Sequence, residues 1–493
     1  MLRVRFFVAV LAASVCLGWT TSSVRAASQE EELFESMRLL IDSFDQVDRF
    51  YVKEVSRREL VEAALRGMLD RLDPYSNYIS PDDLARFNSQ VEQEFGGIGI
   101  QVGLDSQNRL QVLTPLPGSP AYKAGIRAGD LIMQIEGETT HGFDLEKAVK
   151  RLKGKAGVAV KLGVVHLGGS AIEELTVMRE MVHVSSVLGD RYKPDGTWEF
   201  MLNPEKKIGY IRLTSFSRDT VKELKTALTS LKAADMKALV LDLRFNPGGL
   251  LSAATEVSDM FVEEGKIVST KGRNTEEREW KAQKPDTFAG FPMVVLVNGY
   301  SASASEIVSA CLQDNNRAVI VGDRTWGKGS VQNVIEMEQG KSALKLTTAS
   351  YHRPNGKNIH RFPGAKDTDE WGVMPNENYR IILPIEELKK YDEYRRSRDV
   401  LTDKELPASD FVDRQLQKGL EYLDAQLSGK GDKAPDQKPE EKKAEDKKAE
   451  EKKPEADKKA AQIPIRSARE AFVLLFEYEF IFKTLRLLNS RSA

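Results

Sequence analysis

Residues 30–92 carry apolar side chains at helical spacing. Leu33, Met37, Leu40 and Phe44 recur three to four positions apart, and the same spacing returns from Leu60 to Leu69. Such a period of about 3.6 residues is typical of amphipathic helices. The segment Asp73-Pro-Tyr-Ser interrupts the pattern, since proline and its neighbours disfavour a continuous helix. The sequence therefore predicts an N-terminal helical region over residues 30–92.

Residues 93–183 have the shorter period of a β-rich module. The run Phe95-Gly-Gly-Ile-Gly-Ile100 is predicted to open a strand, and a turn at residues 105–108 leads to a second strand at 110–114. Residues 117–132 alternate small and apolar positions around Gly125 and Gly129, and this stretch resembles the helix-turn-strand segment of bacterial PDZ domains. We therefore predict a PDZ domain over residues 93–183.

Residues 184–380 alternate predicted strands and helices, within a core domain that is predicted to span 184–425. Strands are expected at 209–216, 238–244, 293–297, 318–321 and 344–349, and helices at 219–233, 253–262 and 305–312. The strand at 238–244 is mostly apolar, as central strands covered on both faces tend to be. The alternation predicts a layered α/β core.

The composition changes sharply after this core. Residues 429–461 are almost entirely Lys, Glu, Asp, Ala and Pro, which cannot bury enough apolar surface to fold, so we expect a disordered linker. Residues 463–493 include seven Phe and Leu side chains between 472 and 485, and they are expected to form an apolar C-terminal helix. That helix is expected to dock onto a second copy or an adaptor protein, and peripheral membrane association is the alternative.

The chain begins with the features of a secretory signal. Arg3 and Arg5 precede an apolar run that ends near Trp19, and small residues follow up to Ala26. Removal of residues 1–26 would leave 69 basic and 74 acidic residues, a formal charge of −5, with Cys311 as the only cysteine. We expect an exported protein, periplasmic or otherwise extracytoplasmic. The formal charge of the whole chain is −2, so it lacks the excess of positive charge that is typical of nucleic-acid-binding proteins.

Two motifs follow apolar strands and carry candidate chemistry. Residues 298–306 contain Ser301-Ala-Ser-Ala-Ser305, and residues 322–332 contain Lys328 between two glycines. A serine at a strand-to-helix turn can attack a carbonyl if a neutral lysine removes its proton. Such a lysine needs a pKa of about 7 in place of about 10.4, and burial near Trp326 is a plausible source of that shift.

Each motif also has a simpler interpretation. Ser301 or Ser303 could merely cap the following helix, with Glu306 in its first turn. Gly322-x4-Gly327-Lys328 fits part of a P-loop, although Gly329 stands where a magnesium-binding Ser or Thr belongs. The residues alone also leave the choice among Ser301, Ser303 and Ser305 open.

Together with the Asn-Pro-Gly-Gly turn at 246–249, these motifs resemble those of the carboxyl-terminal processing proteases, also called tail-specific proteases. The resemblance covers residues 30–425 and implies a protease core with the crotonase-like spiral fold, a preceding or inserted PDZ domain, and N-terminal helices that contribute to dimer contacts. It implies Ser303 as nucleophile, Lys328 as base and Gln332 as the residue that orients this base. The oxyanion hole is predicted at the N–H groups of Ala304, which follows the nucleophile, and of Gly249, with Gly248 as the fallback.

The PDZ prediction also names a binding segment. A PDZ domain adds a peptide as a strand to a sheet edge and binds its terminal carboxylate through backbone N–H groups. The expected segment is Gly96, Gly97, Ile98, Gly99 and Ile100, because glycine lets a carboxylate approach the backbone. The expected partners are proteins or peptides with free apolar C-termini, and we expect a homo-oligomer.

The histidines suggest no cofactor. His141, His166, His183, His352 and His360 are scattered without metal-ligand spacing, so neither a metal nor another cofactor is expected. The sequence therefore favours an exported serine endopeptidase with a Ser-Lys dyad that recognises C-terminal tails. The alternatives are a proteolytically inactive PDZ scaffold or chaperone, and acyl-CoA chemistry on a crotonase-like fold.

Overall fold

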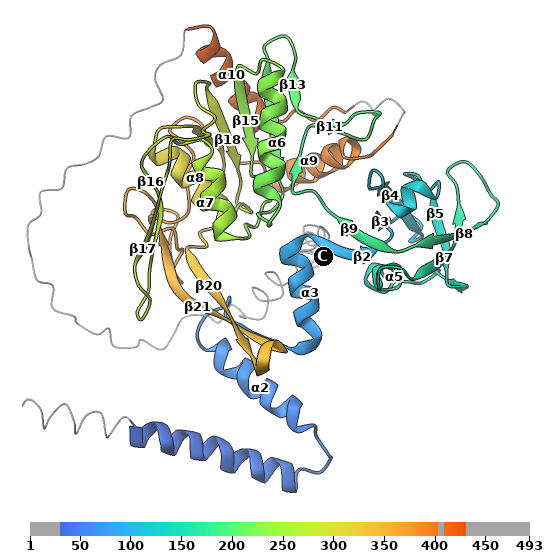
Figure 1. Ribbon diagram of the computed structural model, residues 1–493, viewed down its shortest axis with the longest axis vertical. Helices are drawn as coiled ribbons and strands as arrows, with labels where there is room; N and C mark the ends of the chain where they lie inside the picture. Colours follow the sequence, from blue (N-terminus) through green and yellow to red (C-terminus); the bar gives the residue numbers. More distant parts are fainter. Residues whose placement is uncertain (1–29, 403–408, 430–493) are drawn as a thin grey trace, which may run out of the picture. The chain divides into compact units, whose positions relative to one another are not determined.

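The computed structural model describes residues 30–402 and 409–429 (Figure 1). The chain divides into two compact units, residues 1–80 and residues 81–493. The predicted signal at 1–26, most of the linker at 429–461 and the apolar helix at 463–493 lie outside the described residues.

The first unit is helical, as its apolar spacing predicts. Residues 30–50 form one helix and α2 spans Arg57–Asp70, with the Ser56 hydroxyl accepting a hydrogen bond from Glu59 N–H at its start. The Asp73 carboxylate accepts hydrogen bonds from the N–H groups of Tyr75 and Ser76, which closes a turn after α2. The short strand β1, Asn77–Ile79, follows.

The second unit begins with helix α3, Pro81–Glu92, and a small β module. Its sheet has the order β3 (Ile100–Leu104), β4 (Leu110–Pro115), β5 (Leu131–Ile135), β7 (Ala159–Val165), β8 (Glu173–Met178), and β6 (Glu138–Thr139) pairs with β5. Helices α4 (Pro120–Lys123) and α5 (Leu145–Leu152) complete the module, and α5 buries Ala148 and Leu152 in its apolar core.

The strand predicted to open at Phe95 is two strands. β2 ends at Gly97 and pairs with β9, Glu180–His183, whereas β3 begins at Ile100 and belongs to the sheet. Between them, Ile98 O accepts from Ala121 N–H and Gly99 O accepts from Leu116 N–H. These loop contacts, together with a φ of +73° at Gly99, turn the backbone out of one ladder and into the next. β2 and β9 thus form a separate ribbon that leads into and out of the module.

The larger part of this unit is a layered α/β core. Its central strands β14 (Ile208–Leu213), β15 (Ala238–Asp242), β18 (Met293–Val297) and β19 (Val319–Gly322) are neighbours in that order and parallel. The short strands β10 (Val187–Leu188) and β13 (Met201–Asn203) pair antiparallel with β14. The predicted 293–297 strand has the bounds of β18, because an apolar run bounded by polar residues matches a strand buried on both faces.

Successive residues of these strands face opposite layers. Leu239 and Leu241 pack with helices α6 (Thr220–Ala233), α7 (Leu251–Asp259) and α8 (Ala304–Asp314), whereas Val240 packs with Leu423 of α10 (Arg414–Leu427) on the other face. Figure 1 shows α6, α7 and α8 grouped beside this sheet. The layered α/β core predicted from the alternation of strands and helices is therefore confirmed.

The remaining elements extend this core. β16 (Lys266–Lys271) pairs with β17 (Arg278–Lys281) and with β21 (Ser342–His352), and β20 (Ser330–Met337) pairs with β21. β11 (Arg191–Tyr192) pairs with β12 (Trp198–Glu199), a 3-10 turn spans Glu338–Gly340, and α9 spans Ile385–Arg398. Among the described helices, none has the length and apolarity needed to cross a membrane.

Candidate active site

The three motifs singled out in the sequence all follow carboxyl ends of neighbouring parallel strands. The Asn246–Gly249 turn comes after β15, Ser303 comes after β18, and Lys328 comes after β19. Because β15, β18 and β19 are adjacent and parallel, their carboxyl ends meet at one edge of the sheet. Ligand sites of open α/β sheets lie outside this edge.

Hydrogen bonds join the three segments there. Ala302 N–H donates to Asn246 O over 3.0 Å, which ties the serine segment to the Asn-Pro-Gly-Gly turn. Trp326 N–H donates to Ser301 O over 3.0 Å, which ties the lysine loop to the serine segment. The topology therefore brings together residues that are separated by up to 80 positions in the sequence.

Ser303 has the backbone of a strained turn. Its φ is +56° and its ψ is −112°, a region that non-glycine residues rarely adopt, and it stands immediately before helix α8. It is also 5% exposed. Strain of this kind is stored at functional sites, and a strained strand-to-helix turn is how α/β hydrolases present a nucleophilic serine.

The two neighbouring serines have structural contacts instead. The Ser301 hydroxyl donates to Leu243 O over 2.8 Å and accepts from Asn298 N–H, and the Ser305 hydroxyl donates to Asn246 O over 2.9 Å. Both are fully buried. The geometry therefore favours Ser303 among the three candidates, a choice that the residues alone left open.

The capping interpretation of this segment is also partly correct. Ser303 occupies the N-cap position of α8, and its N–H donates to Glu306 Oε2 over 2.8 Å. A glutamate that accepts from the N-cap N–H is one half of a capping box. The helix start and the presentation of Ser303 are thus two aspects of one arrangement.

The glycine turn lies against the serine. A Cβ at Gly248 would stand 2.8 Å from Ser303 Cβ and 2.9 Å from Ala304 N, so only glycine fits there. Gly248 N–H already donates to the Asn246 side chain over 2.9 Å, which argues against this fallback as an oxyanion donor. For Gly249 N–H, no acceptor is found among the residues that the structure describes. Gly249 and Ala304 stay the predicted oxyanion donors.

Lys328 lies half-buried at the end of a loop whose backbone is firmly held. Arg361 N–H donates to Gly327 O, and Tyr351 N–H donates to Gly329 O, each over 2.8 Å. A Cβ at Gly329 would stand 2.3 Å from His360 N, so this glycine permits close packing of the loop against the chain at His360. Gln332, in β20, donates from Nε2 to Ser330 Oγ and Thr347 Oγ1. The roles of Lys328 and Gln332 in the reaction stay predictions.

Glu306 connects the serine and lysine segments, and the sequence interpretation gave it no role beyond the helix start. Its Oε1 accepts from Thr325 Oγ1 and Gly327 N–H, each over 2.6 Å, and its Oε2 accepts from Ser303 N–H and Lys328 N–H, each over 2.8 Å. Burial raises the pKa of this fully buried carboxyl group, and the four donors oppose that shift. Only its place three residues after a candidate N-cap serine could have drawn attention to it.

The same contacts exclude a phosphate loop. A P-loop presents its backbone N–H groups to phosphate oxygens. Here the N–H groups of Gly327 and Lys328 donate to the protein's own Glu306 carboxylate. The loop is therefore built around an internal carboxylate.

The predicted peptide-binding segment is divided between two elements. Gly96 and Gly97 lie in β2, Ile98 and Gly99 form the link, and Ile100 begins β3. In the described sheet β3 stands at the end of the strand order with β4 as its neighbour, so its other edge is open to an added strand. This is the geometry by which a sheet edge binds an extended peptide.

Three parts of the chain match known protein families. Residues 207–375 match the model of peptidase family S41, residues 86–165 match the PDZ domain, and residues 16–82 match the activating protease CtpB N-terminal domain. A carboxy-terminal-processing protease of Bartonella bacilliformis is 35% identical over 395 residues, with 79% of this chain and 85% of that protein covered. This chain belongs to the carboxyl-terminal processing proteases of peptidase family S41.

A second relative and one solved structure are also similar to this chain. The carboxy-terminal processing protease CtpA of Bacillus subtilis is 33% identical, with 72% of this chain and 74% of that protein covered. A solved photosystem II D1 C-terminal processing protease is 29% identical, with 74% of this chain and 97% of that chain covered and a TM-score of 0.39.

Membership in the family establishes the reaction class and the architecture. The protein is a C-terminal processing serine peptidase that combines an N-terminal helical region, a PDZ domain and an S41 protease core. The expected family, enzyme class and multidomain α/β fold are thereby confirmed, and they displace both the inactive scaffold and acyl-CoA chemistry.

Proposed function

We propose that this protease uses Ser303 and Lys328 as its catalytic dyad to cleave exported proteins that its PDZ domain binds by a free, apolar C-terminus. The observation that carries the choice of nucleophile is the backbone of Ser303. Its positive φ stands at the strand-to-helix turn, whereas the hydroxyl groups of Ser301 and Ser305 are engaged by main-chain partners.

The proposed reaction has two steps. Neutral Lys328 Nζ accepts the Ser303 hydroxyl proton while Ser303 Oγ attacks the carbonyl carbon of the scissile bond. The oxyanion that forms accepts hydrogen bonds from Gly249 N–H and Ala304 N–H, and the lysine returns the proton to the leaving amine. A water molecule then attacks the acyl-enzyme with the same lysine as base, which releases the new C-terminus and restores Ser303.

Gln332 has a supporting role in this proposal. Its side-chain amide is held by Ser330 and Thr347 on strands β20 and β21, and β20 begins two residues after Lys328. An amide fixed on a strand can keep a nearby ammonium or amine in one rotamer. Gln332 would therefore orient the base without exchanging protons.

The proposed substrate recognition rests on the open edge of β3. A peptide that pairs with this edge would bring its last residue toward the link at Ile98 and Gly99, where backbone N–H groups can bind a carboxylate. An apolar pocket then selects the terminal side chain. The proposal is that this capture delivers the preceding segment to the protease core.

Location and assembly are part of the proposal. The charged and apolar pattern of residues 1–26 supports export to an extracytoplasmic compartment. Self-association is supported by the helix at residues 30–50, where Leu33, Phe34 and Ile41 are 62%, 69% and 63% exposed. Large apolar side chains gathered on one helix favour an oligomeric partner.

The substrate proposal is tested with matched peptides of one sequence that end in a free or an amidated apolar residue. Binding to the inactive Ser303→Ala chain should fall at least tenfold on amidation, and the active chain should cleave the free form faster. Equal binding and equal cleavage of the two forms would refute tail recognition. In a second experiment, the inactive Ser303→Ala chain is expressed in the source cells. Exported substrates should stay bound to it uncleaved, and mass spectrometry can identify them.

A further inference from the structure

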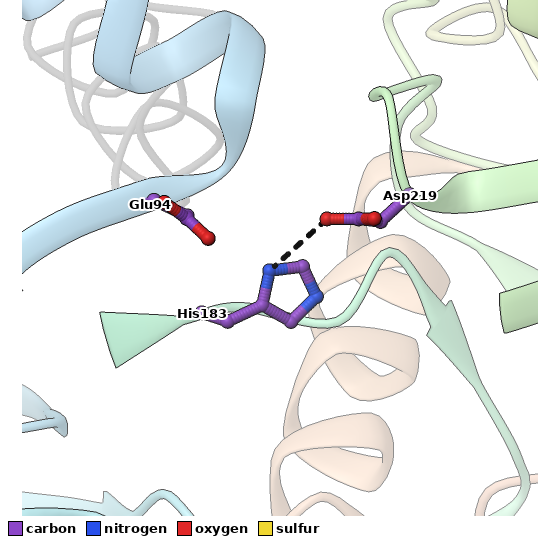
Figure 2. A group of neighbouring side chains, drawn as sticks. All are labelled: Glu94, His183 and Asp219. Atoms are coloured by element: carbon purple, nitrogen blue, oxygen red, sulfur yellow. Dashed lines mark ion pairs between the residues drawn. The ribbon is translucent and has the colours of Figure 1, made fainter. Parts of the chain in front are cut away.

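A histidine and two carboxylates converge where the ribbon of β2 and β9 meets the start of helix α6. One potential ligand atom each from Glu94, His183 and Asp219 lies within 4.8 Å of the other two. Figure 2 shows the three side chains pointing toward one another. They come from β2, from β9 and from the start of α6, up to 125 positions apart, so no sequence spacing could have revealed them.

The ribbon fixes two members of the group. Glu94 and His183 are directly paired residues of the antiparallel strands β2 and β9. Side chains of directly opposed residues share one face of a ladder, with Cβ atoms about 5 Å apart. The backbone alone therefore holds one carboxylate next to one imidazole.

The third carboxylate, that of Asp219, does not cap the helix at whose start it stands. Asp219 is the N-cap residue of α6, yet its side chain makes no capping hydrogen bond. It faces His183 instead, with Asp219 Oδ2 3.6 Å from His183 Nδ1. An N-cap aspartate usually accepts a hydrogen bond from the first helix N–H groups. Because the Asp219 carboxylate faces an imidazole instead, it is available to bind a ligand.

A fourth residue orients the imidazole. His183 Nε2 lies 2.8 Å from Glu223 Oε1, and Glu223 Oε2 accepts from both the N–H and the hydroxyl of Ser186. Because a carboxylate can only accept, Nε2 carries the hydrogen, and Nδ1 of the neutral ring then presents its lone pair toward Asp219. Metal-binding histidines are oriented in this way by a carboxylate on the other ring nitrogen.

We propose that Glu94, His183 and Asp219 bind a divalent transition-metal ion of the Zn²⁺ class. One imidazole and two carboxylates suit Zn²⁺, whereas Mg²⁺ and Ca²⁺ prefer ligand sets made of oxygen alone. A tetrahedral ion about 2.1 Å from each ligand needs those atoms about 3.4 Å apart, so side-chain movements of about 1 Å complete the set. Water would fill the remaining position.

Access and charge both favour a cation here. The three residues line a groove of about 540 Å³ that opens to solvent, and the His183 side chain is 38% exposed. Three carboxylates, Glu94, Asp219 and Glu223, surround the single imidazole. Even a protonated histidine would leave this group with excess negative charge, which a divalent ion neutralises.

A second histidine of the same domain shows the contrast. His166 also contacts two carboxylates, but Asp130 lies at its Nδ1 and Glu173 at its Nε2. Among the described residues, His166 and its two carboxylates do not form a group whose ligand atoms all lie within 4.8 Å of one another. His166 is 40% exposed, close to His183, so it is a matched control for adventitious zinc binding.

The consequence concerns the PDZ domain. β2 and β9 are the two strands through which the chain enters and leaves that domain, and α6 belongs to the protease core. An ion bound by all three residues would cross-link the ribbon to the core. Zinc would thereby restrict the movement of the ribbon without taking part in peptide hydrolysis.

Titration calorimetry with Zn²⁺ on the untagged, full-length Ser303→Ala chain tests the proposal. One ion should bind per chain, His183→Gln should weaken it at least tenfold, and His166→Gln should leave its affinity unchanged. Glu94→Gln and Asp219→Asn should each weaken binding, and they carry the test if His183→Gln does not fold. Hydrogen exchange of residues 94–97 and 180–183 should slow when Zn²⁺ is added.

Three results with the parent chain and the histidine variants would overturn the site. They are no binding by the parent chain, equal affinity of the parent and the folded His183→Gln chain, or loss of binding in His166→Gln in place of His183→Gln. Retained binding in both folded carboxylate variants would equally reject this ligand set.

Discussion

The main chain of Lys328 is bound to the side chain of Glu306: Lys328 N–H donates to Glu306 Oε2 over 2.8 Å, and Ser303 N–H donates to the same oxygen over 2.8 Å. One buried carboxylate oxygen therefore sets the distance between the backbones of the proposed nucleophile and the proposed base. A substitution of Glu306 should therefore displace the backbones of both Ser303 and Lys328.

Glu306→Gln should lower both activity and stability. The substituted amide turns an NH2 group toward backbone N–H donors, and each buried donor that loses its acceptor costs about 1–3 kcal/mol. We expect the free energy of unfolding to fall by about 2–5 kcal/mol and kcat to fall about 100-fold, with a smaller change in KM, because misplacement by about 1 Å can cost that much. Peptide cleavage and urea unfolding measure the two effects.

The matched control is Glu256→Gln, at an exposed glutamate of α7. It should change neither quantity. An active Glu306→Gln enzyme with normal kcat would show that this carboxylate does not position the dyad.

Gly248→Ala should disturb the nucleophile. The added Cβ would lie 2.7 Å from Ala302 O and 2.8 Å from Ser303 Cβ, at a φ of +103°. We expect kcat for peptide cleavage to fall by about 100-fold or more, since the serine turn has to move.

Gly290→Ala separates backbone strain from this contact. Gly290 also has a positive φ, +84°, but a Cβ there meets no atom within 4 Å. Its activity should stay within about twofold of the parent. Equal losses in the two variants would attribute the effect of Gly248→Ala to strain alone.

The rate of peptide cleavage should rise with pH through the titration of Lys328. Only the neutral amine accepts a proton, so the active fraction grows as the lysine loses its charge. Lys328→Arg should be inactive at every pH, because arginine stays charged. A profile of kcat/KM governed by a group near 6.5, the ordinary histidine value, would point to an imidazole base and away from the dyad.

Cys311 should be unreactive in the folded protein. Burial raises the pKa of its thiol to about 12, so at pH 8 it stays protonated, and the thiolate is the reactive form. A chain without residues 1–26 has no other cysteine. Ellman's reagent should therefore detect about one thiol after denaturation and almost none before it. Rapid reaction of the native chain would show that α8 opens readily.

The parts predictable from the sequence are those governed by local patterns. The apolar run at 293–297 has the bounds of β18, and helical spacing from Leu60 to Leu69 lies within α2. The three chemical motifs were recognisable because each follows such a strand, and the parallel order of β15, β18 and β19 then brings them to one edge.

The features that could not be predicted from the sequence depend on contacts between residues that are far apart in the chain. Glu306 looks like an ordinary residue of a helix start until the loop at 325–328 folds over it. The division between β2 and β3 depends on hydrogen bonds from Leu116 and Ala121, some twenty positions away. Likewise, His183 meets Glu94 only through the pairing of β2 with β9.

The most direct test of the proposed dyad is covalent labelling with a fluorophosphonate, followed by mass spectrometry of the modified peptide. The label should attach to Ser303, and Lys328→Ala should lose it while remaining folded. Ser303→Ala, Lys328→Ala and the double variant should have the same residual cleavage rate, because the two residues act as one unit. Labelling of Ser301 or Ser305, or peptide cleavage by Ser303→Ala at the parent rate, would contradict the assignment.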